Sequence, residues 1–151
     1  MADPLTRLLL DTSVVIAGSE AVKLSRGDTA AISVITIGEL RAGVRLAGDP
    51  NTHAIRQARL AAVRDTFEPL PVDELVAEHY GEILAAARAQ KRTSKATDLL
   101  IIATAAATGR ALLTLDGAQA ALARLAGVPV REDCLGRDVR EGRCRQPFDT
   151  L

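Results

Sequence analysis

Four acidic side chains stand where apolar stretches of the sequence end or where helices are expected to begin: Asp11, Glu39, Asp98 and Asp116. Carboxylates packed close together repel one another, and without compensation some of them would take up protons. A divalent cation removes this conflict, and oxygen ligands without nearby Cys or His favour Mg²⁺ or Mn²⁺. Such a cation can activate water for attack on a phosphodiester and offset the charge that develops on the phosphate oxygens. The chemistry expected of this set is metal-assisted hydrolysis.

Two of these acids follow short apolar runs that predict buried strands. Leu8–Leu10 ends at Asp11, and Ala111–Leu115 ends at Asp116. Because the carboxyl ends of parallel strands lie along one edge of an open α/β sheet, both side chains are expected at the edge where such folds bind ligands. A purely structural alternative is that Asp11 caps the following helix, a role that the neighbouring hydroxyl residues could equally serve.

Glu39 is placed by a predicted strand over Thr29–Val34 and a helix after it. Thr36 and Glu39 have the spacing of a capping box, which predicts that Glu39 lies in the first turn and explains both residues without any catalytic role. The start of a helix that follows a parallel strand nevertheless lies at the same sheet edge as the end of that strand. Glu39 is therefore expected near Asp11.

Asp98 precedes the apolar run Leu99–Ala107, which is typical of a helix enclosed by other elements. Ser94 or Thr97 could cap this helix. The helix dipole favours an acid in the first turn, so Asp98 by itself has a structural explanation. Its place beside three other acids at one predicted edge is what suggests a site.

The rest of the chain alternates in the same way. Helices are expected over Thr52–Phe67, Asp73–Gln90 and Ala118–Leu125, with a short edge strand or extended connector over Glu68–Val72 and a last strand over Val128–Val130. Alternation of strand and helix throughout implies a parallel sheet with helices on both faces. The predicted fold class is therefore α/β.

Composition limits the classes of function. The chain of 151 residues is 48% hydrophobic, enough for one domain with a sizeable core. It has one Tyr, two Phe and no Trp, which argues against stacking of bases on aromatic side chains. The formal net charge is zero, so any binding of nucleic acid must come from a local patch.

The sequence predicts one domain over residues 1–131 and a C-terminal tail over residues 132–151, where apolar residues become few. Residues 1–10 lack the pattern of a secretory signal. No apolar run reaches the roughly 20 residues needed to cross a bilayer. We therefore expect a cytoplasmic protein without membrane contact.

One local basic patch lies directly before Asp98. It consists of Arg88, Lys91, Arg92 and Lys95. Such a run is usually only a solvated face, but beside an acidic cluster these cations could hold a phosphate group of RNA.

Four segments, taken together and in order, carry a family resemblance over roughly Leu8–Val130. They are Leu8–Ser13 (LLLDTS), Thr36–Leu40 (TIGEL), Thr97–Ala105 (TDLLIIATA) and Leu113–Asp116 (LTLD). This set resembles the signature segments of PIN-domain ribonucleases, and the chain length and the Thr-x-x-Glu segment most resemble the VapC toxins of bacterial toxin–antitoxin pairs. The resemblance implies a three-layer α/β/α sandwich with a mostly parallel central sheet.

The resemblance also implies a function. VapC toxins are Mg²⁺-dependent endoribonucleases that act on structured RNA such as tRNA or rRNA, leave a 5′-phosphate and a 3′-hydroxyl, form homodimers and are blocked by a VapB antitoxin. Asp11, Glu39, Asp98 and Asp116 match the acidic residues of the family as catalytic and metal-holding groups. The neighbouring hydroxyls that match its supporting residues are Thr12, Ser13, Thr36 and Thr114. The resemblance also implies a further acidic residue in many relatives at the place where this chain has Gln119.

Two other functions are consistent with the sequence. One is a catalytically idle module of the same fold that holds RNA or another protein, which loss of one of the four acids would have favoured. The other is a receiver-like phosphotransfer domain, which also uses Mg²⁺. That domain needs a Lys at the end of a later strand, and a helical Glu39 fits it poorly.

Overall fold

The structure, a computed structural model, describes residues 6–18, 21–22 and 24–131 of the chain. The predicted tail, residues 132–151, and its boundary with the domain lie outside the described residues. The strands are β1 (Arg7–Leu10), β2 (Thr29–Ile32), β3 (Ala111–Leu113) and β4 (Val130–Arg131). The helices are α1 (Thr12–Ala17), α2 (Val34–Arg45), α3 (Pro50–Thr66), α4 (Glu74–Ala89), α5 (Ala96–Ala107) and α6 (Gly117–Leu125).

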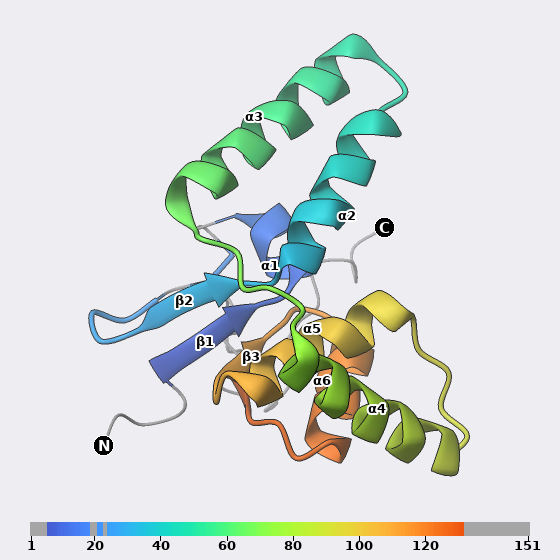
Figure 1. The fold of residues 1–151 in the computed structure, drawn as a ribbon. Coiled ribbons are helices and arrows are strands. Elements are labelled where there is room, and N and C mark those ends of the chain that lie inside the picture. The colour runs from blue at the N-terminus through green and yellow to red at the C-terminus, as the bar shows by residue number, and fades with distance from the viewer. Residues whose placement is uncertain (1–5, 19–20, 23, 132–151) are drawn as a thin grey trace, which may run out of the picture.

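The four strands form one sheet in the order β2-β1-β3-β4, and every neighbouring pair is parallel. Helices α1, α2 and α3 cover one face, while α4, α5 and α6 cover the other (Figure 1). The prediction of an α/β/α sandwich with a parallel central sheet is confirmed. Among the described residues, no helix is long and apolar enough to cross a membrane.

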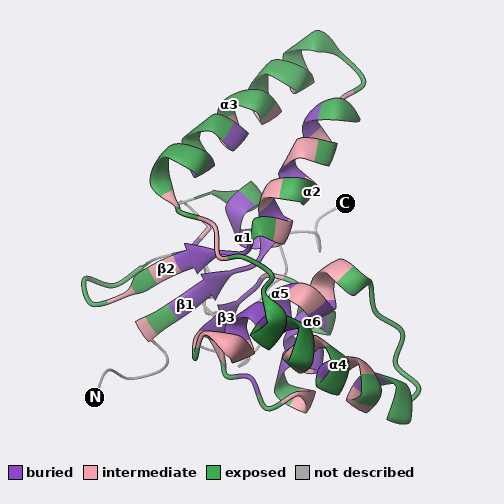
Figure 2. Cartoon of the chain, in the orientation of Figure 1, coloured by how far each residue is buried: buried purple, intermediate pink, exposed green. Residues whose placement is uncertain are grey.

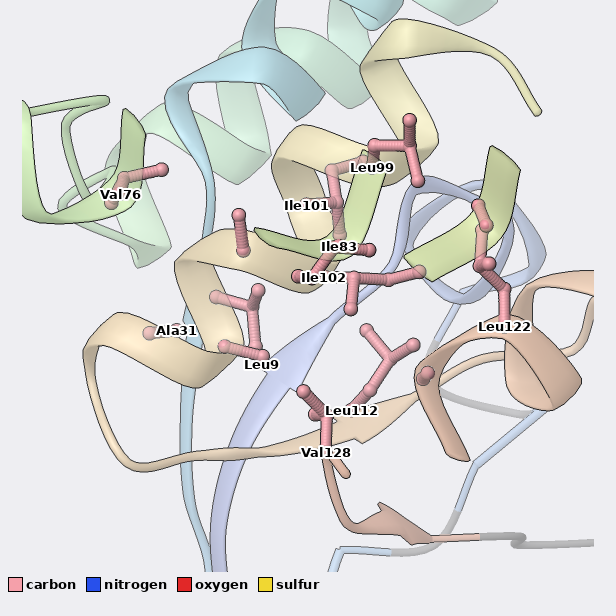
Figure 3. Packing of buried hydrophobic residues seen from close by; sticks show 14 residues of the cluster. Leu9, Ala31, Val76, Ile83, Leu99, Ile101, Ile102, Leu112, Leu122 and Val128 are labelled. Carbon is pink, nitrogen blue, oxygen red and sulfur yellow. The ribbon is translucent and has the colours of Figure 1, made fainter. Parts of the chain in front are cut away.

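The sheet has two faces because side chains alternate along its strands. Leu9 and Leu112 point to the face covered by α4–α6, where they pack with Ile101, Ile102 and other residues of α5 (Figure 3). Leu8 and Leu113 belong to the cluster on the opposite face. All of these side chains are buried, as are the whole of β3 and the carboxyl-terminal residues of β1 and β2 (Figure 2). Packing on both faces therefore fixes the position of the central strands and of their carboxyl ends.

The helices after α2 differ from the predicted bounds by one or two residues, and the strands differ more clearly. Strand β3 ends at Leu113 rather than Leu115. Strand β2 ends at Ile32 rather than Val34, because Ser33 already caps α2. The last strand is Val130–Arg131 rather than Val128–Val130. Of the two alternatives predicted after α3, the structure shows the extended connector, with a single bridge between Ser33 and Leu70.

Helices α2 and α3 form an antiparallel hairpin that extends away from the sheet (Figure 1). Side chains of α3 bind the last carbonyls of α2. Arg56 Nη1 donates to Gly43 O at 2.7 Å, and His53 Nδ1 lies 3.1 Å from Val44 O. Basic groups at a helix C-terminus satisfy carbonyls that have no partner within the helix. These contacts fix the position of α2, which carries Glu39.

Candidate active site

Asp11 lies at the carboxyl end of β1 and at the start of α1. Its backbone N–H donates to Leu113 O at 2.9 Å, which extends the pairing of β1 and β3 by one step. Its side chain caps α1 by accepting a weak hydrogen bond, at 3.4 Å, from the backbone N–H of Ser13. The residue is only 4% exposed. Asp11 therefore serves as a cap and as a buried carboxylate at the sheet edge, so the two interpretations of the sequence are compatible.

Two hydroxyl groups hold one oxygen of Asp11. Ser13 Oγ donates to Asp11 Oδ2 at 2.7 Å, and Thr114 Oγ1 donates to the same oxygen at 2.9 Å. These hydroxyls in turn accept from the backbone N–H groups of Leu115 and Asp116, at 3.1 and 3.0 Å. Oδ2 is thus occupied by bonds anchored in the chain after β3. Oδ1 accepts no hydrogen bond from the described residues and remains available to a ligand.

Glu39 lies in the second turn of α2, so its predicted place in the first turn is wrong. The cap of α2 is Ser33, whose Oγ accepts from the N–H of Ile35 at 3.1 Å, and Thr36 is already helical. Ser33 is completely buried at the end of β2, and a buried hydroxyl must find a hydrogen-bond partner. That requirement starts the helix three residues earlier than the Thr36–Glu39 spacing suggested. Sequence reasoning missed Ser33, whose signal was a small hydroxyl residue directly after an apolar strand.

A chain of hydroxyls orients Glu39. Thr12 Oγ1 donates to Glu39 Oε1 at 2.9 Å and lies 3.1 Å from Thr36 Oγ1. While Glu39 is ionised, the single hydroxyl hydrogen of Thr12 is used on that carboxylate, so Thr36 must be the donor to Thr12. Thr36 is completely buried and fixed within α2. The result leaves Glu39 Oε2 without a hydrogen bond from the described residues.

Asp98 lies in the first turn of α5, as predicted. The predicted caps Ser94 and Thr97 are wrong, because the cap position is Lys95, which makes no side-chain capping bond. In the described part of the chain no group donates a hydrogen bond to Asp98. Both carboxylate oxygens of this residue are therefore available to a ligand.

Asp116 follows β3 and caps α6. Its Oδ1 accepts from the backbone N–H groups of Ala118 and Gln119, at 2.9 and 3.2 Å. The residue is exposed. Its Oδ2 has no hydrogen-bond partner among the described residues. Each of the other three acids has at least one oxygen in the same state.

Electrostatic coupling shows that the four acids share one region. Burial raises the pKa of Glu39, and the charges of Asp11 and Asp98 raise it further against the effect of the Thr12 hydroxyl. Burial also raises the pKa of Asp98, with further contributions from Asp11 and Asp116. Such mutual effects require charges at short range. The carboxylates come from four separate segments and lie near enough for their charges to act on Glu39 and Asp98.

The donor set fits a hard divalent cation held partly through water. All four groups are carboxylates, which suit Mg²⁺ or Mn²⁺. Within residues 6–18, 21–22 and 24–131, no three His, Cys, Asp or Glu side chains are arranged to hold a metal directly. Mg²⁺ usually keeps several waters and takes one or two protein carboxylates. Free oxygens on several neighbouring acids are consistent with that mode.

Comparison with known proteins agrees with this geometry. The PIN domain model matches residues 8–125. Ribonuclease VapC4 of Mycobacterium tuberculosis is 40% identical over 120 residues, which cover 77% of this chain and 91% of that protein. The chain belongs to the PIN-domain family, within its VapC group.

Solved structures show the same PIN fold. A member of the VapBC family of toxin–antitoxin systems from Mycobacterium tuberculosis, VapBC-5, superposes with a TM-score of 0.73 and 36% identity, covering 84% of this chain and 99% of that chain. FitAcB from Neisseria gonorrhoeae gives a TM-score of 0.65 at 29% identity, covering 83% of this chain and 96% of that chain. Membership in the PIN family excludes the receiver-like alternative.

Of the predicted basic patch, only Lys95 interacts with the acidic residues in the described structure. Lys95 acts on the acids, since its charge lowers the pKa of both Glu39 and Asp98 against the effect of burial. Arg88, Lys91 and Arg92 are exposed around the end of α4 and the turn after it. No contact joins them to the four acids in the described structure, so their role in RNA binding stays a prediction.

Gln119, which stands where the family resemblance implies an acidic residue in many relatives, is a neutral amide and is buried. It is 4% exposed, and its Nε2 has no hydrogen-bond partner in the described structure. Its backbone N–H helps to position Asp116. In the structure, Gln119 therefore contributes to the capping of α6.

Removing the Thr114 hydroxyl tests the support of Asp11. We expect Thr114→Val to lower RNA cleavage by about 10- to 100-fold if Asp11 holds a metal ion, as is proposed below, because loss of a group that orients a metal ligand usually has an effect of this size. The change frees Asp11 Oδ2 from one of its donors and leaves the N–H of Asp116 without its acceptor. Thr114→Ser, which keeps the hydroxyl, should retain most activity. Equal rates for Thr114→Val and the unaltered chain would contradict this role.

Proposed function

We propose that this protein is a metal-dependent endoribonuclease toxin that hydrolyses RNA phosphodiester bonds. The observation that carries the proposal is the coupling of Asp11, Glu39, Asp98 and Asp116 at one sheet edge, although they lie far apart in the chain. Relatives named as VapC ribonucleases, 40% and 35% identical, support the same activity.

The proposed cofactor is Mg²⁺, with Mn²⁺ as a substitute. Asp11, Asp98 and Asp116 would hold it directly or through water, and Glu39 would complete the shell or orient the attacking water. When bound, the cation would activate water and offset charge on the scissile phosphate. The chain itself supplies the orientation. The Ser13 and Thr114 hydroxyls hold one oxygen of Asp11 and leave the other free for a ligand, and Thr12 does the same for Glu39.

We propose structured RNA, tRNA or rRNA, as the substrate, with a 5′-phosphate and a 3′-hydroxyl on the products. The family resemblance supports this choice of substrate. The chain has few aromatic side chains on which to stack bases, so recognition would depend on the shape and the phosphates of a folded RNA.

We further propose a VapB-type antitoxin as the partner, a homodimer as the assembly and the cytoplasm as the location. The structural relative VapBC-5 from Mycobacterium tuberculosis is a member of the VapBC family of toxin–antitoxin systems. A cluster of carboxylates in which the pKa values of Glu39 and Asp98 are raised would accept an Arg or Lys of another chain, because a cation relieves the same repulsion that a metal relieves. Such an inserted side chain would block the site.

Metal removal and restoration test the proposed function. Purified protein should cleave tRNA or rRNA in the presence of Mg²⁺. Excess EDTA should lower the cleavage rate by at least about 100-fold, and restored Mg²⁺ should return it to its original value. Sequencing of the fragment ends identifies the RNA and the bond that is cut. A chain that binds RNA but cuts none of the cellular RNA in Mg²⁺ or Mn²⁺ would instead support the idle module.

A further inference from the structure

A pair of arginines lies at the opposite edge of the sheet from the four acids. Arg7 is the first residue of β1, and Arg110 directly precedes β3. These strands are neighbours, with Leu8 paired to Ala111 in parallel register. The register therefore places Arg7 and Arg110 side by side where the two central strands begin, although they are far apart in the sequence.

The two guanidinium groups have almost no compensation from the described chain. Arg110 Nη1 makes one long bond, 3.4 Å, to Leu8 O. Its Nε is buried and donates to nothing in the described structure. Arg7 Nη1 lies 3.9 Å from the place that a Cβ on Gly109 would occupy, so it folds over the turn that leads into β3. Neither arginine forms an ion pair with a described acid.

The charge of this pair is also uncompensated. Burial lowers the pKa of Arg110, and the positive charge of Arg7 lowers it further. Two like charges beside each other, one of them partly removed from water, cost free energy. A bound anion would offset that cost and satisfy the buried N–H.

We propose that Arg7 and Arg110 form a binding site for a phosphate group. Guanidinium groups present paired N–H donors that match phosphate oxygens, and they bind them more strongly than neutral donors do. A strand of four residues at about 3.3 Å each separates this arginine pair from Asp11 by roughly 13 Å. The site is thus distinct from the carboxylate cluster, and it shares no residue with the basic patch before Asp98.

The phosphate could belong to an RNA backbone or be free in solution. The RNA source rests on the proposed function. RNA is the favoured source because the acidic cluster repels an RNA backbone. A chain of zero formal net charge must therefore gain its binding energy for RNA from local cations away from those acids. An RNA held at the arginine pair would contact the protein a few nucleotides away from the bond that is cut.

Binding of inorganic phosphate to the full chain is the first experiment. At matched ionic strength and without divalent cations, phosphate should raise the melting temperature by a few degrees relative to chloride. Arg7→Gln and Arg110→Gln should each lose most of this increase. Arg64→Gln, which removes an exposed arginine of α3, is the matched control and should keep it. No difference between phosphate and chloride in the unaltered chain would overturn the proposal, and so would an equal effect of acetate.

A second measurement avoids variants that fail to fold. Phenylglyoxal modifies accessible arginines, and mass spectrometry locates the modified positions. Phosphate should protect Arg7 and Arg110 at least about threefold in the unaltered chain but leave Arg64 unprotected. Equal protection of all three arginines would overturn the proposal.

Fluorescence anisotropy with a labelled RNA oligonucleotide, also without divalent cations, distinguishes the two sources. If the source is RNA, Arg7→Gln should weaken binding by about 10-fold and reduce the slope of log affinity against log salt by about 0.7, the value for one single-stranded phosphate. Unchanged RNA affinity with a lost phosphate effect would assign the site to free phosphate, which still supports it. Because no cleavage is measured, failure here is distinguishable from failure of the nuclease proposal.

Discussion

Asp98→Asn should abolish RNA cleavage, with a loss of at least about 100-fold in rate at saturating Mg²⁺. The change removes a charged oxygen donor that no described residue binds, while the amide keeps nearly the same shape. Loss of one preorganised electrostatic group at a reacting centre commonly costs 100- to 1000-fold. Initial rates on a cleavable RNA measure the effect. A variant that cuts as well as the unaltered chain would show that Asp98 is not part of the site.

The same substitution should make the metal-free protein more stable near neutral pH. Burial and the charges of Asp11 and Asp116 raise the pKa of Asp98 above its ordinary value of 3.8. An acid with a raised folded pKa destabilises the fold above that pKa, because the folded state resists its ionisation. This penalty disappears as the pH falls below 3.8, where both states are protonated. The melting temperature of Asp98→Asn should exceed that of the unaltered chain at pH 7 and match it at the acidic end.

Asp65→Asn is the matched control for both measurements. Asp65 is an exposed acid on α3. Its substitution should leave cleavage and melting temperature nearly unchanged. Equal stabilisation by both substitutions would show that general charge reduction, and not relief of the acidic cluster, is responsible.

Leu112→Ala should lower the free energy of unfolding by about 3 kcal/mol, within the 2–5 kcal/mol typical of buried leucines. Leu112 is completely buried in β3 and packs in the cluster with α5 and α6. The truncation removes apolar contact and leaves a cavity that a close-packed core cannot fill. Total stability of a domain is only about 5–15 kcal/mol, so this one change removes a large share.

Leu75→Ala on α4 provides the control for this truncation, because that leucine is 54% exposed. It should cost less than about 1 kcal/mol. Urea unfolding followed by circular dichroism measures both values. Similar midpoints for the two variants would contradict the assigned packing of β3.

Much of the fold follows from local sequence patterns. Short apolar runs ending in Asp11 and near Asp116 predicted β1 and β3, and the enclosed apolar run after Asp98 predicted α5. These patterns are reliable because burial on both faces of a parallel strand, or all around a helix, demands apolar residues at nearly every position. The same patterns predicted that the four acids share an edge, since parallel connections bring strand ends there.

Local patterns failed where two residues competed for one role. Thr36 and Glu39 match a capping box, but Ser33 takes the cap because it is buried at the end of β2 and needs a partner. Lys95 occupies the cap position of α5 without any capping bond, so neither Ser94 nor Thr97 serves there. Burial in the folded chain decides such cases, and sequence spacing does not report it.

The sequence by itself determined the order of strands and helices and the family, and it singled out the four acids as candidates for one site. Only the tertiary structure decided which carboxylate oxygens are held and which are free, because the bonds from Thr114 to Asp11 and from Thr12 to Glu39 join residues 103 and 27 positions apart. It also decided that Arg7 stands beside Arg110. Contacts of this kind depend on strand register and packing between elements, whereas the periodicity of a sequence describes one element at a time.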